Sequence, residues 1–266
     1  ALADIPETES FGSSRFPIPG LRVDENYEVE RFGTPNPLAM KFASSAAHLT
    51  GKPLVSSETT TWLADHFKVS LSQIKPQLDE LFAAGINHVF FHGTTYSPQN
   101  SPQTPEGGLK YRINKKAPLG GLGASWPGWL FYASTHYGPT SHFYRHLPLL
   151  TKYIERCQTR LQATQPDNHV LVYFPMHDLW AGPAKSAGGI HQLEVHHVDR
   201  WLLPLPFGRL GESLTRNGLG FDYVSDRQLT DLRAGPGGQL LAAGGRYRVL
   251  VVPETTYLPE TTAQRL

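Results

Sequence analysis

The stretch PLVSSETTTW (residues 53–62), read with INHVFFHGTTY (residues 86–96), decides the fold. Each segment begins as a short apolar run typical of a β-strand and ends in polar and aromatic residues, which predicts strands at 53–57 and 87–92. Between them, apolar residues recur at steps of three and four up to Gly85, which predicts a helix over about 74–84. Strand, helix and strand of these lengths form a βαβ unit, in which the two strands are parallel neighbours.

Glu58 and His92 follow the two predicted strands. The carboxyl ends of parallel strands meet at one edge of a sheet, so both side chains are expected to project from that edge. In barrels and in open α/β sheets this edge carries the chemistry. A carboxylate beside an imidazole at this edge is therefore a candidate active site. The competing structural interpretation is a glutamate that caps a neighbouring helix or pairs with an arginine.

The composition excludes several classes of function. The 266 residues carry 24 basic and 23 acidic side chains, a formal charge of +1, which offers no electrostatic footprint for nucleic acid or an anionic membrane. No apolar run is long enough to span a bilayer, and no targeting signal is present in this segment. Cys157 is the single cysteine, so neither a disulfide framework within the chain nor a cysteine metal cage is available.

The predicted helices and strands form two groups, one after the other along the chain. The first adds helices at 38–49 and about 145–164 to the βαβ unit, with a proline- and glycine-rich excursion at 97–129. The second has strands at 170–174, 221–224 and 248–252 and a helix at about 207–217, which predicts a parallel sheet covered on both faces. We expect domains at 1–165 and 166–266, and we expect the chain to be a segment of a longer protein.

Several long motifs resemble the catalytic domain of glycoside hydrolase family 106, the α-L-rhamnosidases. They are KFASSAAHLTGKPLVSSE (41–58), GINHVFFHGTTYSP (85–98), WPGWLFYAS (126–134), YIERCQ (153–158) and PDNHVLVY (166–173). The resemblance covers roughly residues 34–260. Residues 99–125 depart from the family pattern and look like an insertion, which bears on the substrate.

The resemblance implies an α/β fold: the C-terminal part of a (β/α)₈ TIM-type barrel in residues 1–165, followed by the start of a flavodoxin-like parallel α/β domain. It implies a hydrolase that cleaves terminal α-L-rhamnosyl residues from plant or microbial glycans or glycosides, with inversion. It also implies calcium near the sugar, with ligands outside this segment, contact with the rest of the parent chain, and a periplasmic or extracellular location.

Inverting hydrolysis needs two carboxyl groups, one as acid and one as base for a water. Glu58 is the first candidate, as the general base. In related barrels the partner comes from the fourth strand, which would precede Ala1. Glu194 is the second candidate, since a loop from the second domain can reach back to the barrel mouth.

Candidate substrate-binding residues surround these carboxyl groups. His92 and Tyr96 follow the last barrel strand and have groups that hydrogen-bond to sugar hydroxyls, while Trp62 and Trp126 offer rings that stack on a sugar. One or more of the tryptophans is expected in the core instead.

A histidine-rich loop at 191–199 has metal-ligating residue types. They are His191, Glu194, His196, His197 and Asp199. Their spacing matches no standard zinc motif, and calcium prefers oxygen ligands, so we predict no metal site in this loop. Two alternatives to the rhamnosidase hypothesis remain: a carbohydrate-binding or assembly segment without turnover, and a metal-dependent hydrolase that uses this loop.

Overall fold

The structure is a computed structural model that describes residues 3–16, 33, 35–63, 69–94, 135–138, 141–181 and 194–266, and of Glu194 the backbone alone. In chain order its elements are β1 (Glu7–Gly12), α2 (Pro37–Thr50), β2 (Ser56–Trp62), α3 (Leu71–Ala83), β3 (His88–Phe91), η2 (Tyr144–His146), α4 (Leu147–Gln162), β4 (Val170–Tyr173), α5 (Met176–Ala181), η3 (Glu194–His196), α6 (Val198–Trp201), α7 (Pro206–Arg216), β5 (Phe221–Val224), α8 (Asp226–Asp231), β6 (Arg233–Ala234), η4 (Pro236–Gly238), β7 (Leu240–Leu241), β8 (Arg246–Tyr247), β9 (Val249–Val251) and α9 (Glu260–Arg265).

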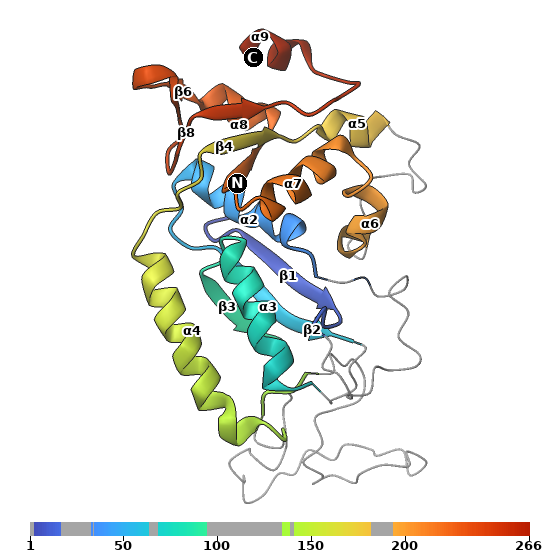
Figure 1. Ribbon diagram of the computed structural model, residues 1–266, viewed down its shortest axis with the longest axis vertical. Helices are drawn as coiled ribbons and strands as arrows, with labels where there is room; N and C mark the ends of the chain where they lie inside the picture. Colours follow the sequence, from blue (N-terminus) through green and yellow to red (C-terminus); the bar gives the residue numbers. More distant parts are fainter. Residues whose placement is uncertain are drawn as a thin grey trace, which may run out of the picture.

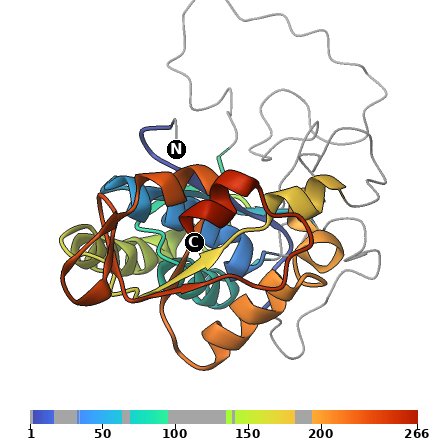
Figure 2. The ribbon, with the colours of Figure 1, turned by 90° about the horizontal axis from the view of Figure 1, so that it is seen from above.

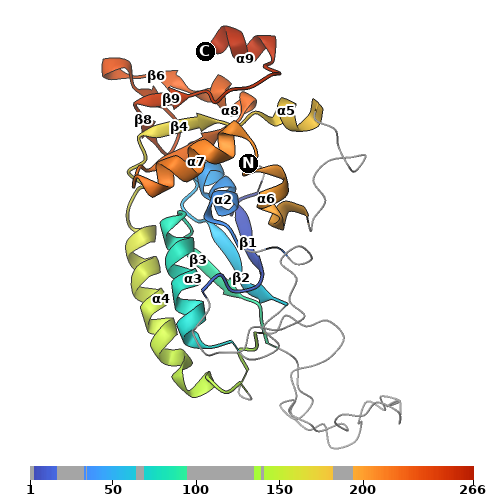
Figure 3. The ribbon, with the colours of Figure 1, turned by 45° about the vertical axis from the view of Figure 1, so that its right-hand side comes forward.

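The first sheet has the strand order β1-β2-β3, and both strand pairs are parallel. Its strands alternate with helices along the chain, so α2 and α3 are the crossovers. Figures 1 and 3 show α3 and α4 side by side on one side of this sheet. Apolar side chains of α2, α3 and α4 form one core there, which includes Ile74, Leu78 and Trp62.

Local sequence explains where the crossover helices begin and end. Asn36 accepts a hydrogen bond from the Leu38 amide at 2.9 Å, and Pro37 occupies the first turn of α2, where it costs no hydrogen bond. Gly51 ends α2 in the left-handed conformation that a glycine adopts without strain. The side chain of Gln73 accepts from the Ser70 amide at 3.1 Å, closing the capping box of α3.

The second sheet has the order β5-β4-β9, again with parallel pairs. Alternate residues of β4 face opposite sides: Val172 packs with α7, while Leu171 packs toward Leu229 of α8. A small antiparallel sheet, β6-β7-β8, follows. Figure 2 views the molecule from the end at which α9 and the C-terminus lie, with α4 on one side and α6 on the other.

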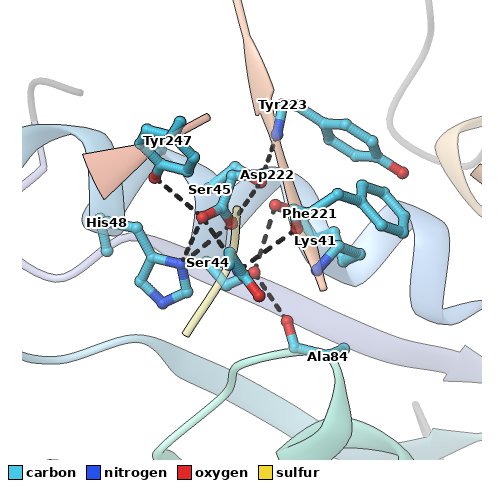
Figure 4. Close-up of polar contacts among 12 residues, drawn as sticks. Lys41, Ser44, Ser45, His48, Ala84, Phe221, Asp222, Tyr223 and Tyr247 are labelled. Atoms are coloured by element: carbon cyan, nitrogen blue, oxygen red, sulfur yellow. Dashed lines mark hydrogen bonds and ion pairs between the residues drawn. The ribbon is translucent and has the colours of Figure 1, made fainter. Parts of the chain in front are cut away.

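Helix α2 joins the two sheets. Its Met40 and Ala47 are buried in the core of the first sheet, while Leu38 and Phe42 pack in a core of the second. At the centre of this junction lies Asp222 of β5, which has no exposed surface (Figure 4). It accepts hydrogen bonds from Ser45 Oγ at 3.2 Å, Asn168 Nδ2 at 3.0 Å and Tyr247 Oη at 2.9 Å, and its Oδ1 lies 2.9 Å from His48 Nδ1.

The predicted α/β class with parallel sheets is confirmed, and every helix and strand named from the sequence pattern in the described ranges has a counterpart. Two differences matter for the site. The strand predicted at 53–57 begins at Ser56 and continues to Trp62, so Glu58 lies inside it. Strand β1 was not predicted, because no apolar pattern before Pro37 indicates a strand. In the part of the chain that the structure describes, no helix has the length and apolar character to cross a membrane.

Candidate active site

Two glutamates lie side by side on the first sheet. Glu9 of β1 and Glu58 of β2 are register partners, and their carboxyl groups are joined by a hydrogen bond. Glu58 has 43% of its side chain exposed and Glu9 has 28%. On the other side of β2, Glu58 is opposite Phe90, whose ring is also exposed. This face of the sheet therefore presents two carboxyl groups and an aromatic ring.

A histidine flanks each glutamate. His92, directly after β3, has Nδ1 3.3 Å from Glu58 Oε1. His196 of η3 has Nε2 3.2 Å from Glu9 Oε2, and its ring stacks on Phe11 with centroids 4.5 Å apart. The histidine-rich loop of the second half of the chain thus reaches the first sheet. The resulting row, His196–Glu9–Glu58–His92, is built from four separate segments.

Close packing fixes one end of this row. Gly33 has φ +71°, and a Cβ added there would lie 2.6 Å from the carbonyl oxygen of His196. Only glycine combines this backbone conformation with so close an approach. Gly33 therefore helps to set the position of η3, and with it the contact between His196 and Glu9.

The two carboxyl groups titrate differently. Burial raises the pKa of Glu58, and the hydrogen bond and negative charge of Glu9 raise it further, against the opposing hydrogen bonds of His92 and Thr61. Burial also raises the pKa of Glu9, but the hydrogen bonds of His196 and Glu58 and the charge of His196 outweigh it, so this pKa is lowered. The pKa of Glu58 is thus higher than that of Glu9, so Glu58 is the second of the two groups to lose its proton as the pH rises.

The structure brings together some of the residues predicted from sequence. Glu58 and His92 are in contact, as their places on neighbouring strands suggest. Glu194 begins η3, two residues before His196, and its side chain is not described. Tyr96 and Trp126 lie outside the described residues.

Trp62 has a different place from the one predicted. Its side chain has no exposed surface and belongs to the core shared with α3 and α4. A ring buried in this way has no face free to stack on a sugar. The structure therefore favours the core role for Trp62.

Sequence reasoning missed Glu9 and His196 as partners. Strand β1 has the sequence ETESFG, in which Thr8 and Phe11 alone are residues enriched in β-strands. Its usable clue is the alternation that puts Glu7 and Glu9 on one face of a strand. For His196, no local pattern points to a strand far away in the sequence.

The described cluster does not fit calcium. That ion takes six to eight oxygen ligands. Here two carboxyl groups are hydrogen-bonded to each other and each also contacts an imidazole. Within the described ranges, no three His, Cys, Asp or Glu side chains are arranged to hold a metal ion. Calcium stays a prediction from the resemblance.

Comparisons with known proteins agree with the sequence motifs. Residues 26–111, which contain Glu58 and His92, match the profile of glycoside hydrolase family 106, described as alpha-L-rhamnosidase. A Formosa agariphila protein, named provisionally as a beta-glucuronidase, is 26% identical over 224 residues, which are 83% of this chain and 15% of that protein.

A solved rhamnosidase structure from Novosphingobium sp. PP1Y superposes with a TM-score of 0.59 at 18% identity, covering 99% of this chain and 20% of that one. The chain thus spans a fifth or less of the length of these two proteins. The chain resembles glycoside hydrolase family 106, the alpha-L-rhamnosidases, in the sequence of residues 26–111, and it shares its fold with part of a rhamnosidase.

Proposed function

We propose that this chain carries the water-activating part of the active site of an inverting α-L-rhamnosidase, with Glu58 as the general base. The observation that carries the proposal is the carboxyl pair. Glu58 lies in the segment that matches the rhamnosidase family, and it is partly exposed beside Glu9 and His92.

The chemistry follows from the properties of Glu58. Its ionised carboxylate accepts a proton from a water while the water oxygen bonds to the anomeric carbon, and the glycosidic bond breaks on the opposite face. A raised pKa makes Glu58 a stronger base than an ordinary glutamate. The negative charge of Glu9 is one cause of this raised pKa, and a substitution of Glu9 can remove it.

Glu9 does not suit the role of the acid partner. The two carboxyl groups of a glycosidase lie about 5–9.5 Å apart, since sugar and water must fit between them, whereas Glu9 and Glu58 are hydrogen-bonded. We therefore assign the proton donor to another part of the parent protein, or to Glu194 through its loop. Glu9 tunes Glu58.

The fold supports this assignment. Three consecutive parallel strands in chain order, with α3 and α4 on one side, are what part of a (β/α)₈ barrel would have. The order β5-β4-β9, second-first-third along the chain, is that of a flavodoxin-like sheet. The proposal includes both assignments, the rest of the parent chain as partner, and a periplasmic or extracellular location.

For the substrate, we propose the sugar that is cleaved, rhamnose, and not the group to which it is attached. Ionised Glu9 would repel the carboxylate of a glucuronide, whereas rhamnose is uncharged. The exposed ring of Phe90, opposite Glu58, offers an apolar surface for a deoxysugar.

The intact protein should hydrolyse 4-nitrophenyl α-L-rhamnoside and leave 4-nitrophenyl β-D-glucuronide unchanged. Proton NMR taken early in the reaction should show β-rhamnose as the first product, because attack from the opposite face inverts the anomeric centre. Hydrolysis of the glucuronide alone would overturn the sugar assignment, and α-rhamnose as first product would overturn the mechanism. Binding of rhamnosides without turnover would favour a carbohydrate-binding segment.

A pH profile tests the tuning by Glu9. The base must be ionised, so kcat/KM should rise as the pH passes upward through the raised pKa of Glu58. The variant Glu9→Gln removes a negative charge, lowers the pKa of Glu58 and should move this acidic limb about one pH unit lower. The control is Glu7→Gln, two residues earlier in β1, whose carboxylate accepts from Ser56 at 2.7 Å. A limb that stays in place in Glu9→Gln, or moves to higher pH, would contradict the tuning.

A further inference from the structure

Strand β2 contains a β-bulge directly after Glu58. Glu9 is the register partner of Glu58, and Phe11 is the partner of Thr61, so Ser10 alone is opposite both Thr59 and Thr60. Thr60 has φ +65°, the one positive φ of a non-glycine residue in the described part of the chain. A β-branched residue rarely adopts this conformation, so the surroundings must hold it there.

Two hydroxyl contacts hold the bulge. Ser10 Oγ accepts a hydrogen bond from the Thr60 amide at 2.7 Å. Thr60 Oγ1 lies 2.8 Å from Tyr137 Oη, and the Tyr137 ring stacks on Phe91 with centroids 4.2 Å apart. Ser10, Thr60 and Tyr137 are all buried. The strained residue is thus tied both to β1 and to the core beside β3.

The bulge reverses the facing of the residues that follow it. In a regular strand, Glu58 and Trp62 would share a face and Thr61 would lie on the other. Instead, Trp62 enters the core and Thr61 lies beside the carboxyl pair. Thr61 Oγ1 donates to Glu58 Oε2 at 3.1 Å.

We infer that Thr61 is a positioning residue for the reaction, brought onto the carboxyl pair by the left-handed bulge at Thr60. Its hydroxyl holds Glu58 Oε2 while His92 meets Oε1, so the plane of the carboxylate is fixed from both sides. This inference rests on the proposed function and adds a residue to that site.

Several charged or titratable groups face Glu58. They are Glu9 from β1, His92 after β3, and His196 of η3 through Glu9. Thr61 itself does not titrate, and its hydroxyl favours the ionised form of Glu58. Loss of this hydroxyl should therefore raise the pKa of Glu58, which is the opposite of the effect of Glu9→Gln.

The test is Thr61→Val in the intact protein, which keeps the shape of the side chain and removes the hydroxyl. We expect kcat for 4-nitrophenyl α-L-rhamnoside to fall about 10- to 100-fold, the usual effect of losing a hydrogen bond to a charged group. KM should change little, and the acidic limb of the pH profile should move to higher pH. Thr61→Ser restores the hydroxyl and should restore both kcat and the limb.

The matched control is Thr59→Val, on the opposite face of the same strand, where Thr59 Oγ1 donates to the Ser57 carbonyl at 3.0 Å. It reports the cost of the same replacement away from the carboxyl pair, and its pH limb should stay in place. A Thr61→Val enzyme with wild-type kcat and pH limb would overturn the inference. So would a loss of activity with an unmoved limb and no rescue by serine, because that is a purely structural effect.

A second readout needs no substrate. Infrared difference titration of the intact protein, with Glu58→Gln to identify the Glu58 carboxyl band, should show this band titrating at higher pH in Thr61→Val. If the wild type proves inactive on rhamnosides but the band moves, the proposed function fails while the contact of Thr61 with Glu58 stands. If the band does not move, the positioning role fails whatever the substrate.

Discussion

Replacing Glu58 by glutamine should lower kcat for aryl α-L-rhamnoside hydrolysis by about 10²–10⁴-fold, the usual contribution of a general base. Glutamine keeps the size of the side chain and its contacts with His92 and Thr61, but its amide cannot take a proton from water. KM should change far less than kcat, since the base acts in the transition state. Steady-state kinetics of the intact protein measure both.

The control for this variant is Glu155→Gln, on the exposed surface of α4, away from the carboxyl pair. It makes the same chemical change and should leave kcat and KM unchanged. A Glu58→Gln enzyme with the wild-type rate would remove Glu58 from the mechanism. Thermal unfolding of both variants shows whether any loss of rate comes from loss of structure.

The second large effect concerns stability. Asp222→Ala should lower the free energy of unfolding by about 3–5 kcal/mol, the usual cost of removing one partner from a buried ion pair. The variant removes the acceptor of Ser45 and of Tyr247 and one of the two acceptors of Asn168. It also leaves Lys41 buried without the nearby negative charge. Since α2 packs on both sheets, this loss acts on their junction (Figure 4).

Melting temperature and urea unfolding of the intact protein measure this effect. The control is Asp231→Ala, at the exposed end of α8, which should have the melting temperature of the wild type. If Asp222→Ala also had the melting temperature of the wild type, the buried network around Asp222 would not stabilise the junction between the two sheets.

The same aspartate predicts how stability depends on pH. Burial raises the pKa of Asp222, but the hydrogen bond and charge of His48, the charge of Lys41 and the hydrogen bond of Asn168 outweigh it, so the pKa is lowered. A carboxyl group with a lowered folded-state pKa stabilises the fold above its unfolded pKa of about 3.9. That contribution is lost as the pH falls further, through the folded pKa. Asp222→Ala should therefore lose less stability than the wild type between neutral pH and about pH 3.

Much of the fold follows from local patterns. The apolar runs before and after the helix at 71–83 identify two strands, and a βαβ connection of that length makes them parallel. Gly51 and Gly85 mark the helix ends, and the continuous apolar run of β4 identifies a strand buried on both faces. These features depend on residues close together in the sequence.

The site was predictable only in part. Glu58 and His92 follow from neighbouring strands, but Glu9 lies on a polar strand with no apolar pattern, and His196 reaches it from a distant loop. Trp62 illustrates a different limit. Regular alternation would place it on the face of Glu58, and a single inserted residue at Thr60 moves it to the core. Such a bulge depends on tertiary contacts with Ser10 and Tyr137, which no local pattern reveals.

The most direct test of the central claim, that Glu58 activates the attacking water, compares leaving groups in Glu58→Ala. Without its base, the intact enzyme should lose a similar factor of kcat on 2,4-dinitrophenyl and on methyl α-L-rhamnoside, because water attack is impaired for both. Azide, which needs no base, should restore turnover of the activated substrate and give β-rhamnosyl azide. A near wild-type rate on the dinitrophenyl substrate without azide would contradict the account, since it would make Glu58 the proton donor or no part of the reaction.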